Sequence, residues 1–215
     1  MKTILQIVLW IVCIFLGYLI YRSVTGPIEF AKVKERRFAA VIEKLKDIRD
    51  SQEAYKTVTG KYANDFNSLI TFVDTAKYTI TQQRDSSYME YDKTYGIDLL
   101  KEITIRDTLG FVPVKDSIFK NSERYKNLMK VPFAQNDENF EMKADFIVRT
   151  GYRVPVFEAK VEKEVVLYDQ PADLIARENA MVSVEEVNGS AIKVGSLSEV
   201  STSGNWPPIY DKKGE

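Results

Sequence analysis

The 215-residue sequence contains no histidine and a single cysteine, Cys13. Without histidine, the chain lacks the side chain that most often acts as a general base near neutral pH and most often binds a metal ion. One cysteine excludes an intrachain disulfide and a zinc site built from several thiolates of the chain. Cysteine usage therefore does not distinguish a cytoplasmic location from a periplasmic one.

Common catalytic and nucleotide-binding motifs are also absent. The sequence has no G-x-S-x-G, no G-x-x-x-x-G-K-[ST] and no G-x-G-x-x-G. Basic and acidic residues number 30 and 31, so neither a basic nucleic-acid-binding face nor an acidic tail is indicated. We expect neighbouring carboxylates to be solvated loop charges: Asp137 with Glu138, Asp169 with Asp173, and Glu185 with Glu186. The sequence predicts no enzymatic activity, no cofactor, no metal and no nucleic-acid partner.

One long segment is strongly apolar. Ile4 to Tyr21 contains a single polar side chain, Gln6. At ~1.5 Å per residue, this helix nearly crosses a hydrocarbon core of ~30 Å. The run is longer than the ~7–15 residues of a signal-peptide core, and no good cleavage site comes after it. These features favour an uncleaved transmembrane anchor over residues 1–25; a cleaved signal peptide and a buried soluble helix are the alternatives.

The charges that flank the anchor give conflicting indications of topology. Lys2 precedes it, and the basic residues after it are Arg22, Lys32, Lys34, Arg36 and Arg37. Counting these charges favours a cytoplasmic domain, whereas the very short N-terminal tail is typical of an anchor that exports the domain attached to it. We expect a single-pass protein of the bacterial inner membrane with a periplasmic domain, and a cytoplasmic domain is the alternative. In the cytoplasm the basic group could contact anionic headgroups; otherwise it forms a solvated helix face.

One face of the anchor has the composition of a helix–helix contact. Gln6, Trp10, Cys13 and Gly17 recur at helical spacing. Cys13 and Gly17 form a small-xxx-small pair, and Gln6 could donate a hydrogen bond to a neighbouring helix. Lateral association is one interpretation. The other is that Gly17 is an ordinary membrane-helix glycine and that Gln6 lies near the interface.

Residues 26–76 read as a pair of amphipathic helices. Gly26-Pro27 is expected to break the chain, with a new helix running from Pro27 to about Val58. A seam of large residues has a spacing of three and four: Phe38, Val41, Leu45, Ile48, Gln52 and Tyr55. Such a seam either packs on its own domain or forms a coiled coil between subunits. A second helix, capped by Asn64 or Asp65, is expected to run to about Ala76.

Residues 77–200 are expected to form a mainly antiparallel β domain. Expected strands cover 78–81, 102–106, 111–114, 140–149, 152–161, 165–168, 182–187 and 191–194. Thr150-Gly151 and Asn188-Gly189 are typical hairpin turns. A loop or weak helix is expected over 83–96, a turn over 107–110, and helices over 116–129 and 171–175. Residues 201–215 are expected to form a loose tail, in which Trp206 could be pinned to the domain. Since helices precede strands, the fold class is α+β.

A stretch after the seam resembles a known family. Glu53-Ala54-Tyr55 is followed by Gly60-Lys61-Tyr62-Ala63-Asn64-Asp65-Phe66 and Leu69. This stretch, together with the order of elements, resembles type IV pilins and type II secretion pseudopilins at the point where their long helix ends. The resemblance implies an antiparallel sheet after the helix and a role in assembly. It does not include a prepilin cleavage motif or a glutamate within the hydrophobic run. The chain also looks like uncharacterised single-pass membrane proteins of Bacteroidota.

We therefore expect a non-enzymatic, membrane-anchored structural or assembly subunit of a bacterial envelope complex. Its expected partners are the membrane, other envelope proteins and further copies of itself or of a related subunit. The alternative is a membrane-tethered module that binds a ligand or a peptide.

Overall fold

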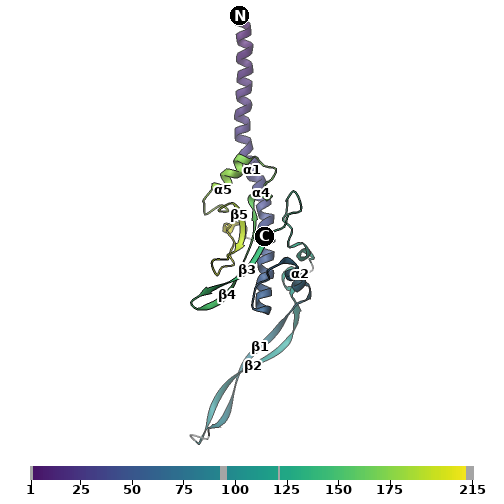
Figure 1. The fold of residues 1–215 in the computed structure, drawn as a ribbon, viewed down its shortest axis with the longest axis vertical. Helices are drawn as coiled ribbons and strands as arrows, with labels where there is room; N and C mark the ends of the chain where they lie inside the picture. Colours follow the sequence, from purple (N-terminus) through teal and green to yellow (C-terminus); the bar gives the residue numbers. More distant parts are fainter. Residues whose placement is uncertain (1, 93–95, 121, 212–215) are drawn as a thin grey trace.

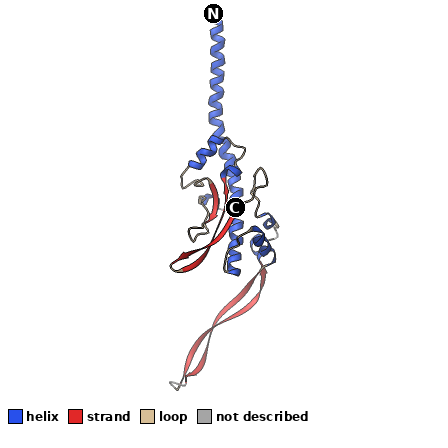
Figure 2. Ribbon diagram, viewed as in Figure 1, coloured by secondary structure: helices blue, strands red, loops and turns tan. Residues whose placement is uncertain are grey.

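The computed structural model describes residues 2–92, 96–120 and 122–211 of an α+β chain (Figures 1 and 2). A long N-terminal helix is followed by short helices and two antiparallel sheets. The elements are α1 (Lys2–Thr59), α2 (Phe66–Thr75), β1 (Lys77–Asp92), β2 (Ile97–Pro113), α3 (Val114–Phe119), η1 (Arg124–Asn127), β3 (Glu141–Arg149), β4 (Tyr152–Glu162), α4 (Lys163–Val166), α5 (Ala172–Ala180), β5 (Ala191–Gly195) and η2 (Pro208–Asp211).

Helix α1 is continuous, and the expected break at Gly26-Pro27 is wrong. Pro27 lies inside the helix. A proline inside a helix removes one backbone hydrogen bond and usually costs about 3 kcal/mol or more. Here the helix is favoured on both sides of Pro27, by the apolar segment before it and by the buried seam after it. Proline also keeps the φ value that a helix requires.

The two halves of α1 have different surroundings. The large apolar side chains described from Ile7 to Val24 are exposed, whereas residues from Phe30 onward enter the core of the domain. Within the part of the chain that the structure describes, α1 is the one helix long and apolar enough to cross a membrane, judged by length and composition. Figure 1 shows this half of α1 projecting alone from the domain.

The seam predicted from the sequence forms the centre of the domain. Phe38, Val41, Leu45 and Ile48 are each fully buried. They contribute to a single core together with residues of the three-stranded sheet and of the short helices. Figure 1 shows that sheet on one side of α1 and α2 on the other. The seam therefore packs on its own domain and is not free to form a coiled coil between subunits.

The end of α1 and the start of α2 agree with the sequence prediction. α1 ends at Thr59, and Gly60 comes next with a φ of 78°. The side chain of Asp65 accepts hydrogen bonds from the backbone N–H and the hydroxyl of Ser68, both at 2.8 Å, and so caps α2. Buried Gln52 holds the turn between the helices: it donates to the carbonyl of Ala63 at 2.8 Å and accepts from the Ala63 N–H at 2.9 Å.

The three-stranded sheet has the order β3–β4–β5 and is antiparallel throughout. The predicted hairpin at Thr150-Gly151 is confirmed, with φ values of 52° and 82°. Positive φ at both central residues is the requirement of a type I′ turn, whose twist matches that of the flanking strands. Strand β4 is central and contributes Phe157 and Ala159 to the core.

Strands β1 and β2 form a separate two-stranded sheet, which we call the arm. The prediction of short strands with a loop or weak helix over 83–96 is wrong for the described residues, because β1 runs to Asp92 and β2 starts at Ile97. The expected turn at 107–110 is a bulge: Thr108 pairs with Thr81 and Gly110 with Ile80, and the register shifts between them. Residues 93–95 lie outside the described chain.

Three other segments differ from expectation. The helix expected over 116–129 is replaced by α3 and η1. Residues 165–168, expected as a strand, form the end of the short helix α4 and a turn after it. Residues 182–187 form no strand, so Asn188-Gly189 leads into β5 without making a hairpin, and β5 pairs with β4 instead. The helix expected to open at Pro171 is confirmed as α5.

The C-terminal segment is held firmly up to Asp211, in contrast to the loose tail expected there. Trp206 is buried in the core, and its indole N–H donates to Asp211 at 3.2 Å. The side chain of Asn205 donates to the carbonyl of Ala191 at 2.8 Å and accepts from the backbone of Lys193 at 2.9 Å. A Cβ atom on Gly204 would lie 2.3 Å from the Trp206 ring, so the ring needs glycine at this position.

Candidate functional site

The predicted contact face of the anchor lies on the free half of α1. Trp10 is 70% exposed, and Cys13 and Gly17 are exposed as well. A Cβ atom added to Gly17 would meet no other atom within 4 Å, so this side of the helix is open to a close approach. Lateral association through Gln6, Trp10, Cys13 and Gly17 stays a prediction.

The predicted seam divides into a buried part and an edge. Gln52 is fully buried, and its side-chain amide makes the two hydrogen bonds to the Ala63 backbone. Tyr55 is half-buried and packs edge-on against Phe72, with ring centroids 4.9 Å apart. The seam thus positions the domain along α1 and presents Tyr55 at the rim of a surface groove.

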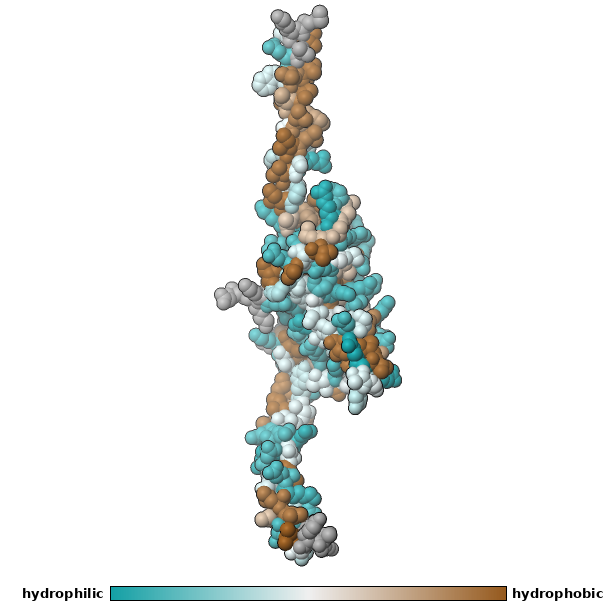
Figure 3. Space-filling model, turned by 90° about the vertical axis from the view of Figure 1, so that its left-hand side faces the viewer, coloured by the Kyte–Doolittle hydropathy of each residue, from teal (hydrophilic) through white to brown (hydrophobic). Residues whose placement is uncertain are grey.

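The arm ends in an apolar tip. Met89 and Leu100 face each other across the strands and are 66% and 63% exposed. Exposed apolar side chains occur on both faces near this end: Tyr88, Met89, Tyr91, Ile97, Leu99 and Leu100. Figure 3 shows this brown tip beyond a teal and white part of the arm, with further brown atoms where the arm joins the domain. An exposed apolar cluster of this kind is typical of an interaction surface.

Charged side chains along the arm pair with one another across its two strands. Arg84 lies 3.4 Å from Asp107, and the Glu90 carboxylate lies 2.5 Å from the Lys101 ammonium. Both pairs are well exposed, so each contributes little to stability. Each of these four charged side chains nevertheless has an ionic partner within the chain. The apolar tip, in contrast, has no cover among the described residues of the chain.

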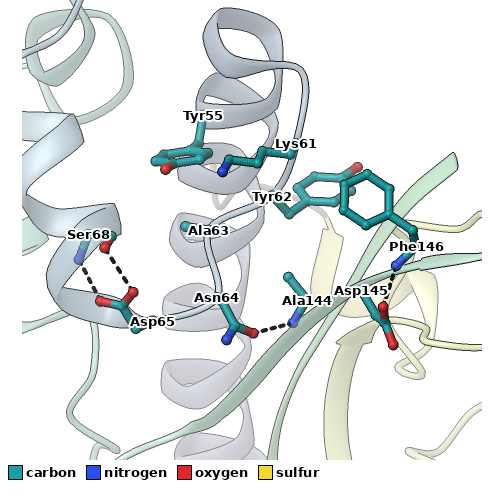
Figure 4. A pocket seen from close by; sticks show the side chains of 10 residues that line it. All are labelled: Tyr55, Lys61, Tyr62, Ala63, Asn64, Asp65, Ser68, Ala144, Asp145 and Phe146. Carbon is teal, nitrogen blue, oxygen red and sulfur yellow. Dashed lines mark hydrogen bonds between the residues drawn. The ribbon is translucent and has the colours of Figure 1, made fainter. Parts of the chain in front are cut away.

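A shallow groove of about 350 Å³ lies between the end of α1 and the edge strand β3 (Figure 4). Its lining residues are Tyr55, Lys61, Tyr62, Ala63, Asn64, Asp65, Ser68, Ala144, Asp145 and Phe146. Asn64 accepts a hydrogen bond from the Ala144 N–H at 3.2 Å and so covers one position of the β3 edge. The groove therefore joins polar side chains to an exposed strand edge.

A buried ion cluster fastens α1 to α5. The Lys163 ammonium is fully buried and donates to the Glu178 carboxylate at 3.1 Å and to the Val187 carbonyl at 2.7 Å. Lys34 donates to Glu178 at 3.0 Å and to Glu186 at 2.8 Å. Burial is the largest single influence on the pKa of Lys34 and lowers it, but the hydrogen bonds to Glu186 and Glu178 and their negative charges together outweigh burial and raise that pKa.

Arg37 makes a second link between α1 and the segments after β4. Its guanidinium binds both oxygens of Asp169 at 2.7 and 2.8 Å and the Val166 carbonyl at 2.8 Å. The hydrogen bonds from Arg37, and then the one from Gln170, lower the pKa of Asp169 to about 2. The expectation of solvated charges is therefore wrong for Lys34, Arg37 and Asp169, and no spacing signal in the sequence points to these distant pairs.

The carboxyl group of Asp47 lies in surroundings that disfavour its ionised form. Burial raises its pKa to about 6, although Arg124 lies 3.0 Å away and opposes the shift. Asp47 lies on α1 against η1, away from the groove. Among the described residues, no three acidic or thiol side chains come together to hold a metal ion. The clusters fasten the domain to α1, and the tip and groove are its candidate contact surfaces.

Comparison with known proteins gives no further guide to these surfaces. No family model, no curated protein and no solved structure matches the chain.

Proposed function

We propose that this chain is a non-enzymatic, membrane-anchored structural or assembly subunit of a bacterial envelope complex, pilin-like or secretion-associated. In this proposal the free half of α1 crosses the inner membrane, the domain sits beside the bilayer, and the arm contacts a partner subunit. The single observation that carries the proposal is the arrangement of two exposed apolar surfaces at opposite ends of one elongated molecule (Figure 3).

The construction of α1 supports the anchoring role. One uninterrupted helix supplies both the exposed apolar segment and the centre of the domain core. Any force on the domain is therefore transmitted to the apolar segment through helix hydrogen bonds and not through a flexible linker. A domain that only needed to be held near a membrane would not require this rigid connection.

The arm supports an assembly role. A two-stranded hairpin has no core of its own and is only marginally stable in water. The arm nevertheless extends far beyond the domain and carries a cluster of exposed apolar residues at its end, besides Leu109 and Phe111 near its base (Figure 3). Burying a large apolar side chain contributes roughly 1.5–3 kcal/mol, so contact with a partner would stabilise the arm and the complex together.

We place the domain in the periplasm, and the cytoplasm is the alternative. The basic residues after the anchor, counted by themselves, favour the cytoplasm. Two of those basic residues, Lys34 and Arg37, are bound by carboxylates of the domain. These pairs form only in the folded domain, whereas flanking charges act during insertion, so the basic residues keep the cytoplasm as the alternative.

Site-specific photocrosslinking in native membranes tests the proposal. A benzophenone amino acid at position 89 or 100 should give discrete adducts with a second copy or another envelope protein. The same residue at Val148, which is 70% exposed but lies on the β3–β4 hairpin, is the matched control. If positions 89 and 100 yield only monomer while the protein is membrane-bound and folded, the assembly role is wrong.

The groove favours a second candidate, a membrane-tethered module that binds an extended peptide. Backbone groups at the edge of a sheet can pair with an added strand, and Lys61 would attract an acidic side chain or a terminal carboxylate. Lys61→Glu should then weaken binding of acidic peptides, with Lys77→Glu on the arm as the control. Peptide binding that is equal in both variants would remove this candidate.

A further inference from the structure

The domain begins at the level where the apolar segment ends. No charged side chain lies between Lys2 and Arg22. If the hydrocarbon core starts at Ile4, a thickness of ~30 Å is crossed by about Val24 at ~1.5 Å per residue. The headgroup layer extends the bilayer by roughly 5–7 Å on each side, or about four more residues of helix.

Parts of the domain already cover α1 at that level. Thr25 and Gly26 are half-buried, and Phe30 is buried in the core. Figure 1 shows α5 at the end of the domain nearest the apolar segment. An upright α1 therefore places the α5 end of the domain against the headgroup layer.

The loop after α5 has an unusual surface for a segment in water. Val182 and Val184 are each 89% exposed, and Met181 is exposed as well. The loop is nevertheless ordered by hydrogen bonds, from the Ser183 N–H to Asn188 at 2.9 Å and from the Glu185 N–H to the Ser183 hydroxyl at 3.2 Å. Leaving two valines exposed forgoes the favourable free energy of burying them.

Both ends of this loop are fixed to α1 through the ion cluster. Lys34 binds Glu178 before the loop and Glu186 at its end. Lys163 binds the Glu178 carboxylate and the Val187 carbonyl. These bonds set the height of the loop along α1, so the exposed valines are held at one level relative to the apolar segment.

We propose that the loop over residues 181–185 inserts its apolar side chains into the interfacial layer of the same bilayer that α1 crosses. With Val24 and Ile28 of α1, both exposed, it forms an apolar collar resting on lipid. This inference rests on the proposed membrane anchoring.

The charges around the collar suit a zwitterionic lipid surface. Three are basic and three acidic: Arg22, Lys32, Arg177, Glu29, Asp173 and Glu185, all exposed. Their signs cancel, so the contact does not depend on anionic lipid. Partial burial of the valines supplies the favourable free energy, in the way that monotopic segments bind at the interface.

A depth measurement on the full chain tests the collar. Cys13 is replaced by alanine, and an NBD fluorophore is attached to a single new cysteine made by Val182→Cys or Val184→Cys. The protein is reconstituted in phosphatidylcholine vesicles that contain lipids spin-labelled near the headgroup. Val148→Cys is the matched control, because it is also an exposed valine but lies on the hairpin remote from the apolar segment (Figure 1).

We expect blue-shifted emission and several-fold stronger quenching at 182 and 184 than at 148. Water-like emission at 182 and 184 in protein that floats with the vesicles overturns the collar and leaves the anchoring intact. Equal quenching at 184 and 148 also overturns it. If the protein does not float with the vesicles, the anchoring and the collar fail together.

Discussion

The buried ammonium of Lys163 gives the sharpest test of how the domain is attached to α1. Its side chain is fully buried, and its partner Glu178 is nearly so. Lys163→Met keeps much of the volume but removes the charge and three donated hydrogen bonds, to the Glu178 carboxylate, the Glu178 carbonyl and the Val187 carbonyl. Glu178 then keeps only Lys34 as an ionic partner among the described residues.

The expected cost is large. Breaking a buried ion pair by removing one partner costs about 3–5 kcal/mol, because the other charge stays buried and loses compensation; Lys34 offsets part of this loss for Glu178. A domain of ordinary size has a total stability of about 5–15 kcal/mol. Lys163→Met should therefore lower the free energy of unfolding by about 3–5 kcal/mol. Glu178→Gln should cost a similar amount, and the double variant should cost clearly less than the sum of the two.

Denaturant unfolding of the full chain in detergent measures these values. Trp10→Phe leaves Trp206 as the one remaining tryptophan, and its buried ring reports on the core. Lys126→Met is the control, because its pair with Glu123 is exposed and should contribute little to stability. A loss below about 1 kcal/mol for Lys163→Met, or simple additivity in the double variant, would refute the reasoning.

Three further changes have definite expected results. Burial raises the pKa of Asp47 to about 6, so the folded state retains a proton that the unfolded state has released between pH 4 and 6. Asp47 should therefore contribute a loss of stability as pH rises through this range, and Asp47→Asn should remove that contribution and gain at most about 3 kcal/mol above pH 6. A pH profile of stability with the same shape in the variant and the wild type would contradict this. Gln52→Ala should lower the free energy of unfolding by about 2–4 kcal/mol, because the Ala63 N–H and carbonyl both lose a hydrogen-bond partner. A cost near zero in denaturant unfolding would show that these two hydrogen bonds are dispensable. Trp206→Ala should cost about 3–5 kcal/mol, measured by circular dichroism, whereas a loose tail would tolerate it.

Local patterns in the sequence predicted local structure well. The seam from Phe38 to Ile48 was visible because burial on one side of a helix imposes a spacing of three and four. The Thr150-Gly151 turn was visible because few residue pairs adopt positive φ at both central positions. The Asp65 cap was visible because a carboxylate satisfies the free N–H groups at a helix start.

Structural features that depend on contacts between residues far apart in the sequence were not predicted. Pro27 suggested a break, but the packing of α1 after it and the apolar segment before it keep the helix continuous. The segment from Arg84 to Glu90 is polar and looked like a loop, yet it pairs along its length with β2. Residues 182–187 have the composition of a strand, but the ion cluster holds them as a loop at one end of the domain.

The candidate surfaces were predicted only in part. The apolar segment was found from its length and its near-complete lack of polar side chains. The apolar tip was missed, since Met89 and Leu100 lie in separate stretches that the register alone brings together. The exposed valines of the collar were interpreted as residues of a strand, because a sequence does not distinguish an apolar residue that faces protein from one that faces lipid.

The fate of the apolar segment in cells is the most direct test of membrane anchoring. Membranes are washed with alkaline carbonate, and the protein is extracted with detergent and weighed by intact mass spectrometry. We predict that the chain stays with the membranes and that its mass includes residues 4–21. Recovery of a chain that lacks this segment, or release of the whole chain into the wash, would contradict the anchoring.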